Sequence, residues 1–510
     1  MTNSSTSTDT LSPPRDLEKA EEQPPVDPDQ HKKEASPSPT LDRDTKDQDP
    51  FLVHLDADES PKALSFARKV VIMLVISSGA LCSTFASSVA AFAEPGEEKS
   101  FGVSKEVTIL GVSLYVLGIA FGPLLAGPLS ELYGRSPIYR VSYILFFAFS
   151  WPVAFAPDIG VFLVFRFLTG FCCSAFLSVA GGSMSDIFAG LQVAVPTAIY
   201  TLSPFIGPML GPLVSGFINQ NTNWRWTYRI LIIWVFVEVL FIFALVPETY
   251  EPALRKTKAK KLRKTTGDSR YYAPLDKRSG SLINLVAVSC YRPFELLFMD
   301  RMNFLLDLWT SLIFGILYLT FQAYPYIFVV NHGFDVQSTG LAFIGLGIGM
   351  CVGTATNIWL IIRTHKLHPG VEPPPEARLI TGEVGAVIVP ASLYMLAFTS
   401  YRHVHWIAPV IATALFGVGF ILCFSSTFTY LVSGYRPMAA SAMAANAFAR
   451  SMFAAAFPLF AGQMYVALGT DGATALLAGI MTIAAPLPFI FHRIGGRLRA
   501  QSRFANHAQT

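Results

Sequence analysis

The chain alternates between long apolar segments and short polar loops from Val70 almost to its end. Each apolar segment is about twenty residues long, the length an α-helix needs to cross the hydrocarbon core of a membrane. A helix is expected there because it satisfies every backbone polar group within the segment. The pattern predicts twelve spans, at residues 70–92, 106–126, 140–156, 161–185, 193–217, 227–247, 304–329, 339–362, 379–399, 406–430, 440–467 and 473–492.

The longest interruption of this pattern, residues 248–303, divides the predicted spans into six and six. We therefore predict an all-α membrane protein, with twelve transmembrane helices in two pseudo-symmetric six-helix bundles. Such a layout is typical of a binding site near the membrane midplane, between two related halves. The predicted parts are a disordered cytosolic N-terminal tail (1–65), an N-terminal bundle (66–250), a basic cytosolic central loop (251–303), a C-terminal bundle (304–495) and a cytosolic C-terminal tail (496–510).

The first forty residues are rich in serine, proline and charged side chains, and they contain no apolar core. A secretory signal peptide needs such a core, so we do not expect one here. A segment of this composition buries too little apolar surface to offset the entropy of ordering, which predicts a solvated, inert tail. A tail regulated by phosphorylation is the alternative.

Lysine and arginine gather in the loops on one predicted side of the membrane, although the formal net charge is only +3. Basic residues close to span ends favour the cytoplasmic side. We therefore expect both termini and the central loop in the cytosol, and the protein in the plasma membrane. Anionic lipid or a partner can also bind a basic loop, but topology alone accounts for this one. The basic positions are Lys62, Arg68, Lys69, Arg135, Arg140, Arg255 to Lys264, Arg363, Lys366, Arg378, Arg436, Arg493, Arg497, Arg499 and Arg503.

Composition narrows the class of function. With 52% hydrophobic and only 14% charged residues, the chain is too apolar for an ordinary soluble enzyme. The phosphate-binding G-x-x-x-x-G-K-[ST] pattern and the H-E-x-x-H and G-x-S-x-G patterns do not occur. We therefore expect neither ATP-driven transport nor an enzyme, and no cofactor. The six cysteines lack metal-binding spacing, so we expect no metal site, and the charge distribution does not favour nucleic acid as a partner.

The stretch "GPLSELYGR" lies between predicted spans 2 and 3 and resembles the signature loop of the major facilitator superfamily. The matching residues are Gly127, Glu131, Gly134 and Arg135, whereas Ser136 stands where a second basic residue is usual. The resemblance implies that Glu131 lies near the N-terminal end of span 11 and helps to close the cytoplasmic side. A plain capped helical hairpin is the alternative.

Further segments resemble the fungal twelve-span drug:proton antiporter family within that superfamily. They include "VFRFLTGF", which carries Arg166, and "SPFIGPMLGPLVSG", which resembles the antiporter motif through Gly207, Pro208, Gly211 and Pro212. The resemblance covers residues 65–505 and implies proton-coupled efflux of drugs, toxins or other small organic compounds. Two departures put the usual coupling network in doubt: Gln322 stands where glutamate is frequent, and Ser433 where aspartate is expected.

Several polar residues inside the spans are candidates for the proton or substrate pathway, because a polar side chain in a membrane is costly without a role or a partner. They are Arg166, Gln322, Tyr324, Asn446 and Arg450. The aromatic residues of span 7 can hold a cationic or flat apolar compound by stacking and cation–π attraction, although lipid-facing filler is as good a reading of any single ring.

A proton antiporter also needs a group whose charge changes during transport. The candidates are Glu238, the deepest acid of the N-terminal half, and Asp307, which we expect nearer the cytoplasmic surface, where water reaches it. The low dielectric expected around Glu238 favours the neutral, protonated form of its carboxyl. The alternative is a permanent ion pair between Glu238 and Arg229 or another cation.

The expected partners are thus a small organic substrate, protons and membrane lipid, with the chain acting as a monomer. Two other functions remain open. One is a dedicated exporter of a single physiological solute, such as a polyamine or a self-made secondary metabolite or mycotoxin. The other is a non-transporting nutrient sensor, which typically needs a longer structured cytosolic extension than this chain offers.

Overall fold

The computed structural model describes residues 49, 51–188, 194–276, 282–367, 374–435, 438–502 and 504. The chain divides into two units, Met1–Pro50 and Phe51–Thr510, and every helix among the described residues belongs to the second. Most of the predicted N-terminal tail lies outside the described residues. The helices are α1 (Phe66–Ser88), α2 (Glu94–Phe101), α3 (Lys105–Tyr133), α4 (Arg135–Ala154), α5 (Ile159–Cys173), α6 (Ala175–Ser178), α7 (Ala180–Ile187), α8 (Ala194–Asn221), α9 (Arg225–Leu245), α10 (Glu251–Thr266), α11 (Leu282–Met299), α12 (Arg301–Tyr324), α13 (Val336–Leu367), α14 (Ile380–Thr399), α15 (Ile407–Gly434), α16 (Ala439–Ala484) and α17 (Pro486–Gln501).

The described residues contain ten helical segments that are long and apolar enough to cross a membrane. The last of them, Ala439–Ala500, joins two spans, because α16 breaks at Gly469, whose φ of 73° is non-helical. The 20-residue helix α4 lies between two of the other segments. With these counted separately, the described part of the chain holds the twelve helices that the hydropathy pattern predicts, and the all-α prediction is confirmed.

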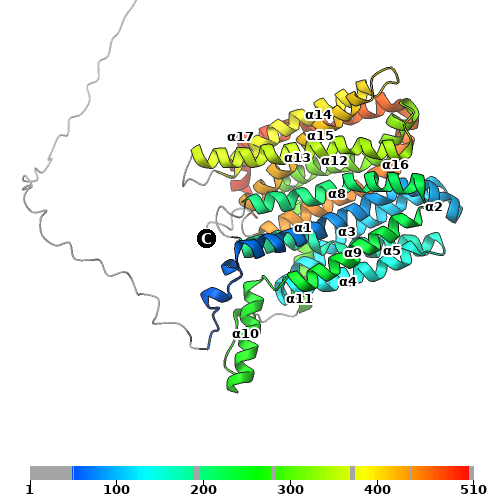
Figure 1. The fold of residues 1–510 in the computed structure, drawn as a ribbon. Coiled ribbons are helices and arrows are strands. Elements are labelled where there is room, and N and C mark those ends of the chain that lie inside the picture. The colour runs from blue at the N-terminus through cyan, green and yellow to red at the C-terminus, as the bar shows by residue number, and fades with distance from the viewer. Residues whose placement is uncertain are drawn as a thin grey trace, which may run out of the picture. The chain divides into compact units, whose positions relative to one another are not determined.

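The helices form two bundles (Figure 1). In the first half α1 packs against α8 and α9, and α5 packs against α3 and α4; in the second half α12 packs against α16, and α15 against α13 and α14. The halves meet where α8 packs against α13 and where α3 packs against α16. In the order of the spans, α8 and α13 are spans 5 and 8, and α3 and α16 are spans 2 and 11. Spans 2 and 5 of the first half correspond to spans 8 and 11 of the second, so the two contacts are equivalent. The interface therefore has the symmetry expected of two related halves.

Local sequence explains where several helices begin and end. Asp158 caps α5 by accepting a hydrogen bond from the backbone N–H of Val161 at 3.0 Å. The side chain of Asp300 caps α12 by accepting from two backbone N–H groups at 3.0 Å. Both are the side-chain acceptors that helix N-termini favour. Gly134 separates α3 from α4 with a φ of 101°, a conformation that a larger residue adopts only under strain.

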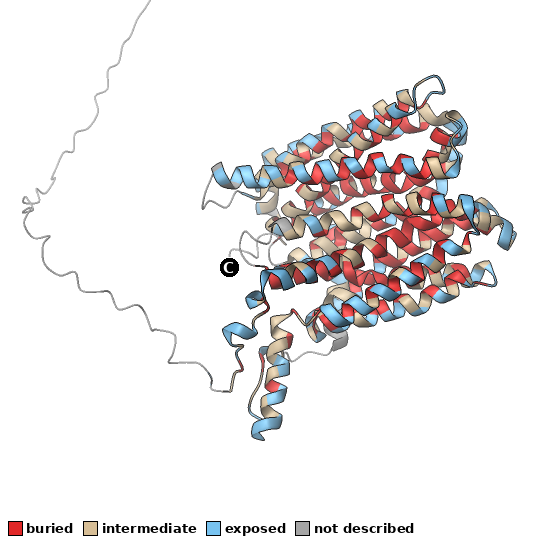
Figure 2. Ribbon diagram, in the orientation of Figure 1, coloured by how far each residue is buried: buried red, intermediate tan, exposed pale blue. Residues whose placement is uncertain are grey.

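The buried side chains line the inside of the bundles, while the outward faces are half-buried or exposed (Figure 2). Large apolar side chains cover those outward faces, as expected for surfaces that contact lipid rather than water. Examples are Leu74, Ile233, Phe236, Leu240, Phe398 and Ile483.

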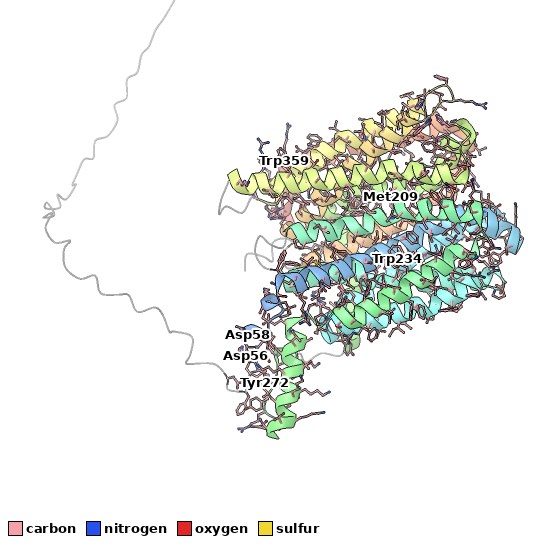
Figure 3. All side chains as sticks on the ribbon, viewed as in Figure 1. Asp56, Asp58, Met209, Trp234, Tyr272 and Trp359 are labelled. Carbon is pink, nitrogen blue, oxygen red and sulfur yellow. The ribbon has the colours of Figure 1, made fainter. Side chains whose placement is uncertain are left out.

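We call the side where α1 begins and α10 lies the basic side, and the side where α2 lies the opposite side (Figure 1). The central loop contains two helices, α10 and α11, that the sequence analysis did not predict. Lys258 of α10 forms ion pairs with Asp56 at 2.7 Å and Glu59 at 2.6 Å, and Asp56 lies beside α10 in Figure 3. The segment from residue 51 to 65, assigned to the tail by sequence, therefore includes an ordered stretch on the basic side.

Candidate functional site

Arg166 of α5 is buried, with 1% of its surface exposed. Its guanidinium faces the rings of Tyr115, at 4.5 Å, and Tyr228, at 5.7 Å. A buried arginine requires acceptors for its N–H groups, and backbone carbonyls supply them here. These are Gly111 at 2.9 Å from Nε, Ala86 at 2.9 Å from Nη1 and Ser87 at 3.4 Å from Nη2.

Two glutamates of α2, Glu94 and Glu97, are also buried, with 3% and 0% of their surfaces exposed. The sequence analysis treated this stretch as a solvated loop and missed both. Tyr228 donates a hydrogen bond to Glu97 Oε1 at 2.7 Å, while Glu97 Oε2 has no hydrogen-bond partner. The spacing of three residues, which places both carboxyls on one face of a helix, was the signal available in the sequence.

These glutamates lie in α2, between the first two spans, and burial raises the pKa of both. Desolvation raises the pKa of Glu97 to about 7, although the hydrogen bond from Tyr228 and the charge of Arg166 lower it. Desolvation likewise raises the pKa of Glu94 to about 8, against a hydrogen bond from Gln322 and the charge of Lys105. Both carboxyls therefore titrate near neutral pH, where a modest pH difference changes their charge.

Gln322 of α12 joins the two halves on the opposite side. Its Nε2 donates to both carboxylate oxygens of Glu94, at 2.8 and 3.0 Å. One turn earlier along α12, the hydroxyl of Tyr318 shares a hydrogen bond of 2.8 Å with Ser87 of α1. Tyr324 is fully buried against Phe343 of α13, with ring centroids 4.0 Å apart. The glutamine that replaces the family's glutamate thus binds an acid from the other half of the molecule.

Asp307 of α12 is fully buried, so the expectation that it lies where water reaches it is wrong. The cause is amide packing: Asn303 donates to its Oδ2 at 2.7 Å, and Asn446 of α16 donates to its Oδ1 at 2.9 Å. Asn446 also donates to Thr310 at 2.8 Å. The polar groups of α12 and α16 therefore bond to one another inside the second half, although Oδ1 of Asn303 and Oδ1 of Asn446 have no hydrogen-bond partner.

Arg450 lies on the same helix as Asn446, one turn further from the basic side. Its guanidinium is surrounded by aromatic rings of α8, α12 and α15. Its Nε has no hydrogen-bond partner. It is about 16 Å from the start of α16 at 1.5 Å per residue, near the middle of a hydrocarbon core about 30 Å thick.

Glu238 of α9 is buried and faces α1, where the hydroxyl of Ser78 donates to its Oε2 at 2.9 Å. Its Oε1 has no partner. Arg229 lies over the rings of Phe155 and Trp226, and no ion pair between it and Glu238 is present in the described part of the chain. The alternative of a permanent pair with Arg229 is therefore not what the structure shows.

The residues of the signature loop are organised by a residue far away in sequence, Glu248. Its carboxylate accepts from the backbone N–H groups of Arg135, at 2.9 Å, and Ser136, at 3.1 Å, and so caps α4. The side chain of Arg135 contacts Asp186 at 3.2 Å and donates to Ser130 at 2.7 Å.

The other two residues of the signature loop have room around them. Glu131 is exposed, and the described residues provide it with no hydrogen bond or ion pair. A Cβ placed on Gly127 would meet no atom within 4 Å. The loop therefore presents Glu131 freely on the basic side.

The antiporter motif brings α8 close to α1. A Cβ on Gly207 would lie 2.0 Å from Thr84 Oγ1, and one on Gly211 would lie 2.0 Å from Ser88 Oγ, so only glycine fits. Pro208 and Pro212 follow these glycines inside the same helix. The carbonyl of Pro212 would lie 2.9 Å from a Cβ on Gly340 of α13. Helix α8 is thus packed closely against both halves.

Among the described residues no group of three or more His, Cys, Asp or Glu is arranged to hold a metal ion.

Comparison with known proteins gives three findings. The profile of the Major Facilitator Superfamily matches residues 76–458. "Efflux pump atB" of Aspergillus terreus is 42% identical over 90% of this chain and 91% of that protein, and "Probable drug/proton antiporter YHK8" of Saccharomyces cerevisiae is 40% identical over 88% of each. A solved structure, "Crystal structure of D-xylose-proton symporter", shares the fold, with a TM-score of 0.60 at 17% identity over 83% of this chain and 97% of the other.

Proposed function

The chain belongs to the major facilitator superfamily, and from this membership we propose that it is a proton-coupled exporter of small organic compounds at the plasma membrane. The printed names of the two relatives, an efflux pump and a drug/proton antiporter, support export and proton coupling. Both relatives are matched over most of their length. A transporter rather than an enzyme is what family membership implies.

The observation that carries proton coupling is the environment of Glu97. It is fully buried, titrates near neutral pH and has one carboxylate oxygen without a hydrogen bond. The nearby charge of Arg166 favours its ionised form, whereas burial favours its protonated form. A movement that brings water to Glu97 would therefore release its proton, and a movement that buries it again would favour uptake.

Glu94 extends this coupling to the second half. Gln322 holds its carboxylate across the contact between the halves. Separation of the halves on the opposite side must break these bonds and expose the acid. We propose that Glu94 and Glu97 load and release protons when that side opens, while Arg166 positions them electrostatically.

Glu238 and Asp307 remain candidate carriers within the spans. Glu238 has one free carboxylate oxygen, as Glu97 does, but it faces α1 within the first half. Both oxygens of Asp307 accept amide hydrogen bonds. We rank Glu97 first because it alone combines a free oxygen with an adjacent buried arginine.

The signature loop and the antiporter motif have proposed mechanical roles. We propose that Glu131 meets the N-terminal end of α16 when the basic side closes. Gly207 and Gly211, with Pro208 and Pro212, keep α8 close to α1 while α8 moves against α13.

Purified protein in liposomes with a trapped pH-sensitive dye tests the proposal. A panel of fungicides, polyamines and mycotoxins, each added against a proton gradient, should include compounds whose transport moves protons in the opposite direction. The variants Glu97→Gln, Glu94→Gln, Glu238→Gln and Asp307→Asn are compared with Glu98→Gln, a neighbouring acid that is only half-buried. Loss of proton movement in Glu97→Gln alone, with downhill exchange retained, identifies the carrier. Transport that ignores the gradient for every compound contradicts proton coupling.

A growth screen in yeast lacking its own pumps separates a multidrug exporter from a dedicated one. Resistance to several unrelated compounds indicates the first, and resistance to one chemical type indicates the second. Tags on each terminus, probed from both sides of the plasma membrane, test whether both termini are cytosolic. No resistance and no transport despite surface expression favours a sensor.

A further inference from the structure

The surroundings of Arg450 differ from those of Arg166, the buried arginine of the first half. Four phenyl rings face its guanidinium, and we call Arg450 together with these rings the aromatic site. The distances from Cζ to the ring centroids are 5.8 Å for Phe205, 5.2 Å for Phe314, 6.0 Å for Phe424 and 5.4 Å for Phe428.

The aromatic site draws on both halves of the molecule. Phe205 comes from α8 of the first half, whereas the other rings come from α12 and α15 of the second. Phe205 contacts Phe424 with ring centroids 5.0 Å apart, so the rings form one continuous surface across the contact. The site therefore lies at the midplane and between the halves, where this fold places substrate.

The guanidinium in this site has no hydrogen bonds. Its Nε is buried without a partner, and neither of its other nitrogens bonds to a described residue. No carboxylate in the described ranges forms an ion pair with it, and the polar groups that act on it electrostatically are the hydroxyls of Tyr200 and Tyr318. Arg166, by contrast, donates to three carbonyls.

An arginine left in this state is costly. Its Nε–H has lost contact with water without gaining an acceptor, and aromatic rings offset only part of that loss. Arg450 nevertheless remains half-buried rather than fully enclosed, so an approaching group can reach it. A carboxylate would restore two hydrogen bonds and neutralise the charge, because its two oxygens match the guanidinium fork.

We propose that the aromatic site binds a small aromatic carboxylate as transported substrate, with the carboxylate on Arg450 and the ring among Phe205, Phe314, Phe424 and Phe428. The inference rests on the proposed function, since it names the substrate class of that exporter. Aromatic residues in a span suggest by themselves that the site prefers a cationic compound, and the presence of Arg450 reverses this preference. The rings already surround a cation, so a second cation is repelled and an anion is attracted.

Three probes of the same shape test this assignment on the full chain in lipid nanodiscs: 2-naphthoate, 2-naphthamide and 2-naphthylmethylammonium. Binding is measured by isothermal calorimetry and by the shift in melting temperature. Naphthoate should bind at least about tenfold more tightly than the amide, the difference expected for a charge-assisted bidentate contact. Equal affinity for all three probes, or preference for the ammonium compound, overturns the proposal without any variant.

Two variants locate the contact. Arg450→Gln should lose the preference for naphthoate over naphthamide, and Arg450→Lys should retain part of it, since lysine keeps the charge without the fork. The matched control is Arg229→Gln, which removes another span arginine that lies over two aromatic rings and has an unpartnered Nε. A preference for naphthoate that survives in Arg450→Gln places the anion elsewhere and overturns the assignment.

The same probes separate this inference from the proposed function. Proton-driven transport of the amide or the amine, with no binding of naphthoate, refutes the anion site and leaves the exporter intact. Naphthoate binding that depends on Arg450, without proton-driven transport of any of the three probes or of the panel compounds, supports the anion site and contradicts the proton-coupled exporter.

Discussion

Single side chains in this protein are distinguished by what compensates their charge. Arg166 and Arg450 both lie inside spans, yet the first is bonded to backbone carbonyls and the second only faces rings. Asp307 has two amide donors, whereas Glu97 has a tyrosine on one oxygen and nothing on the other. In low dielectric, an uncompensated charge is costly, so the poorly compensated residues are those whose state transport can change.

Glu97 should make the stability of the protein depend on pH. Its pKa in the folded protein, about 7, lies above the ordinary value of 4.5. The stabilisation by its proton is complete below about pH 4.5 and is lost as the pH rises through about 7, with a total of about 3 kcal/mol. The melting temperature of the wild-type protein in nanodiscs should therefore fall over this range.

The variant Glu97→Gln stays neutral and should show a flatter profile over the same range. Glu94 contributes a further decline towards about pH 8, where its own pKa lies. The half-buried Glu98 provides the control, since Glu98→Gln should keep the wild-type slope. An unchanged slope in Glu97→Gln would show that folding does not raise the pKa of the Glu97 carboxyl in the wild-type protein.

Arg166 is expected to be required for transport and not for membrane expression. Arg166→Ala removes the charge that acts on Glu97 and takes the guanidinium donor from three carbonyls, at a cost of about 1–3 kcal/mol for each one that is left without another partner. We expect reduced but measurable surface protein and no efflux. Arg225→Ala is the comparison, because Arg225 also donates to two backbone carbonyls, at 3.2 and 3.1 Å, but on the opposite side near the lipid surface. Full drug resistance in Arg166→Ala contradicts the role.

At the scale of elements, hydropathy predicted the spans because each is a continuous apolar run. It did not predict α10 or α11, because neither segment has the continuous apolar run that marks a span. It also assigned Glu94 and Glu97 to a loop, because their burial depends on Gln322 and Tyr228, which are more than a hundred residues away. Its position inside a predicted span identified Arg450 as a candidate, but only packing shows that no carboxylate pairs with it among the described residues.

Close packing of α1 against α8 gives a prediction at this scale. Gly207→Ala places a methyl group 2.0 Å from Thr84 Oγ1 and 2.8 Å from the backbone nitrogen of Phe85, so the helices must separate. Overpacking of this kind costs about 1–3 kcal/mol. We expect a lower melting temperature and slower transport, with partial recovery in the double variant Gly207→Ala, Thr84→Ala, which removes the clashing hydroxyl. Gly479→Ala, where the methyl group meets no atom within 4 Å, should behave as wild type.

At the scale of the whole membrane domain, the contacts between the halves on the opposite side are specific and polar. Gln220 of α8 donates to Asp335 at 2.7 Å and accepts from the backbone N–H of Gln337 at 2.9 Å. Gln322 and Glu94 add a second bridge. On the basic side, Glu131 is exposed and has no such partner among the described residues. The structure therefore corresponds to a state closed on the opposite side, and alternating access requires a second state with these contacts reversed.

The last prediction concerns that second state. When the opposite side opens, Gln220 and Asp335 must separate, and Glu131 should approach the N-terminal end of α16, where exposed N–H groups and the helix dipole favour an anion by about 1 kcal/mol. Spin labels at Tyr133 and Ala440, both exposed on the basic side, report this approach without altering Glu131. Labels at Asn221 and Val336, both exposed beside that contact, report the other side without removing Gln220 or Asp335, in a background with Cys351, Cys172 and Cys290 replaced by serine. The distance on the basic side should shorten as the distance on the opposite side lengthens. Glu131→Gln should reduce the fraction of molecules that show the short distance on the basic side. Distances that change independently, or a basic side that closes equally well in Glu131→Gln, would remove Glu131 from the gate.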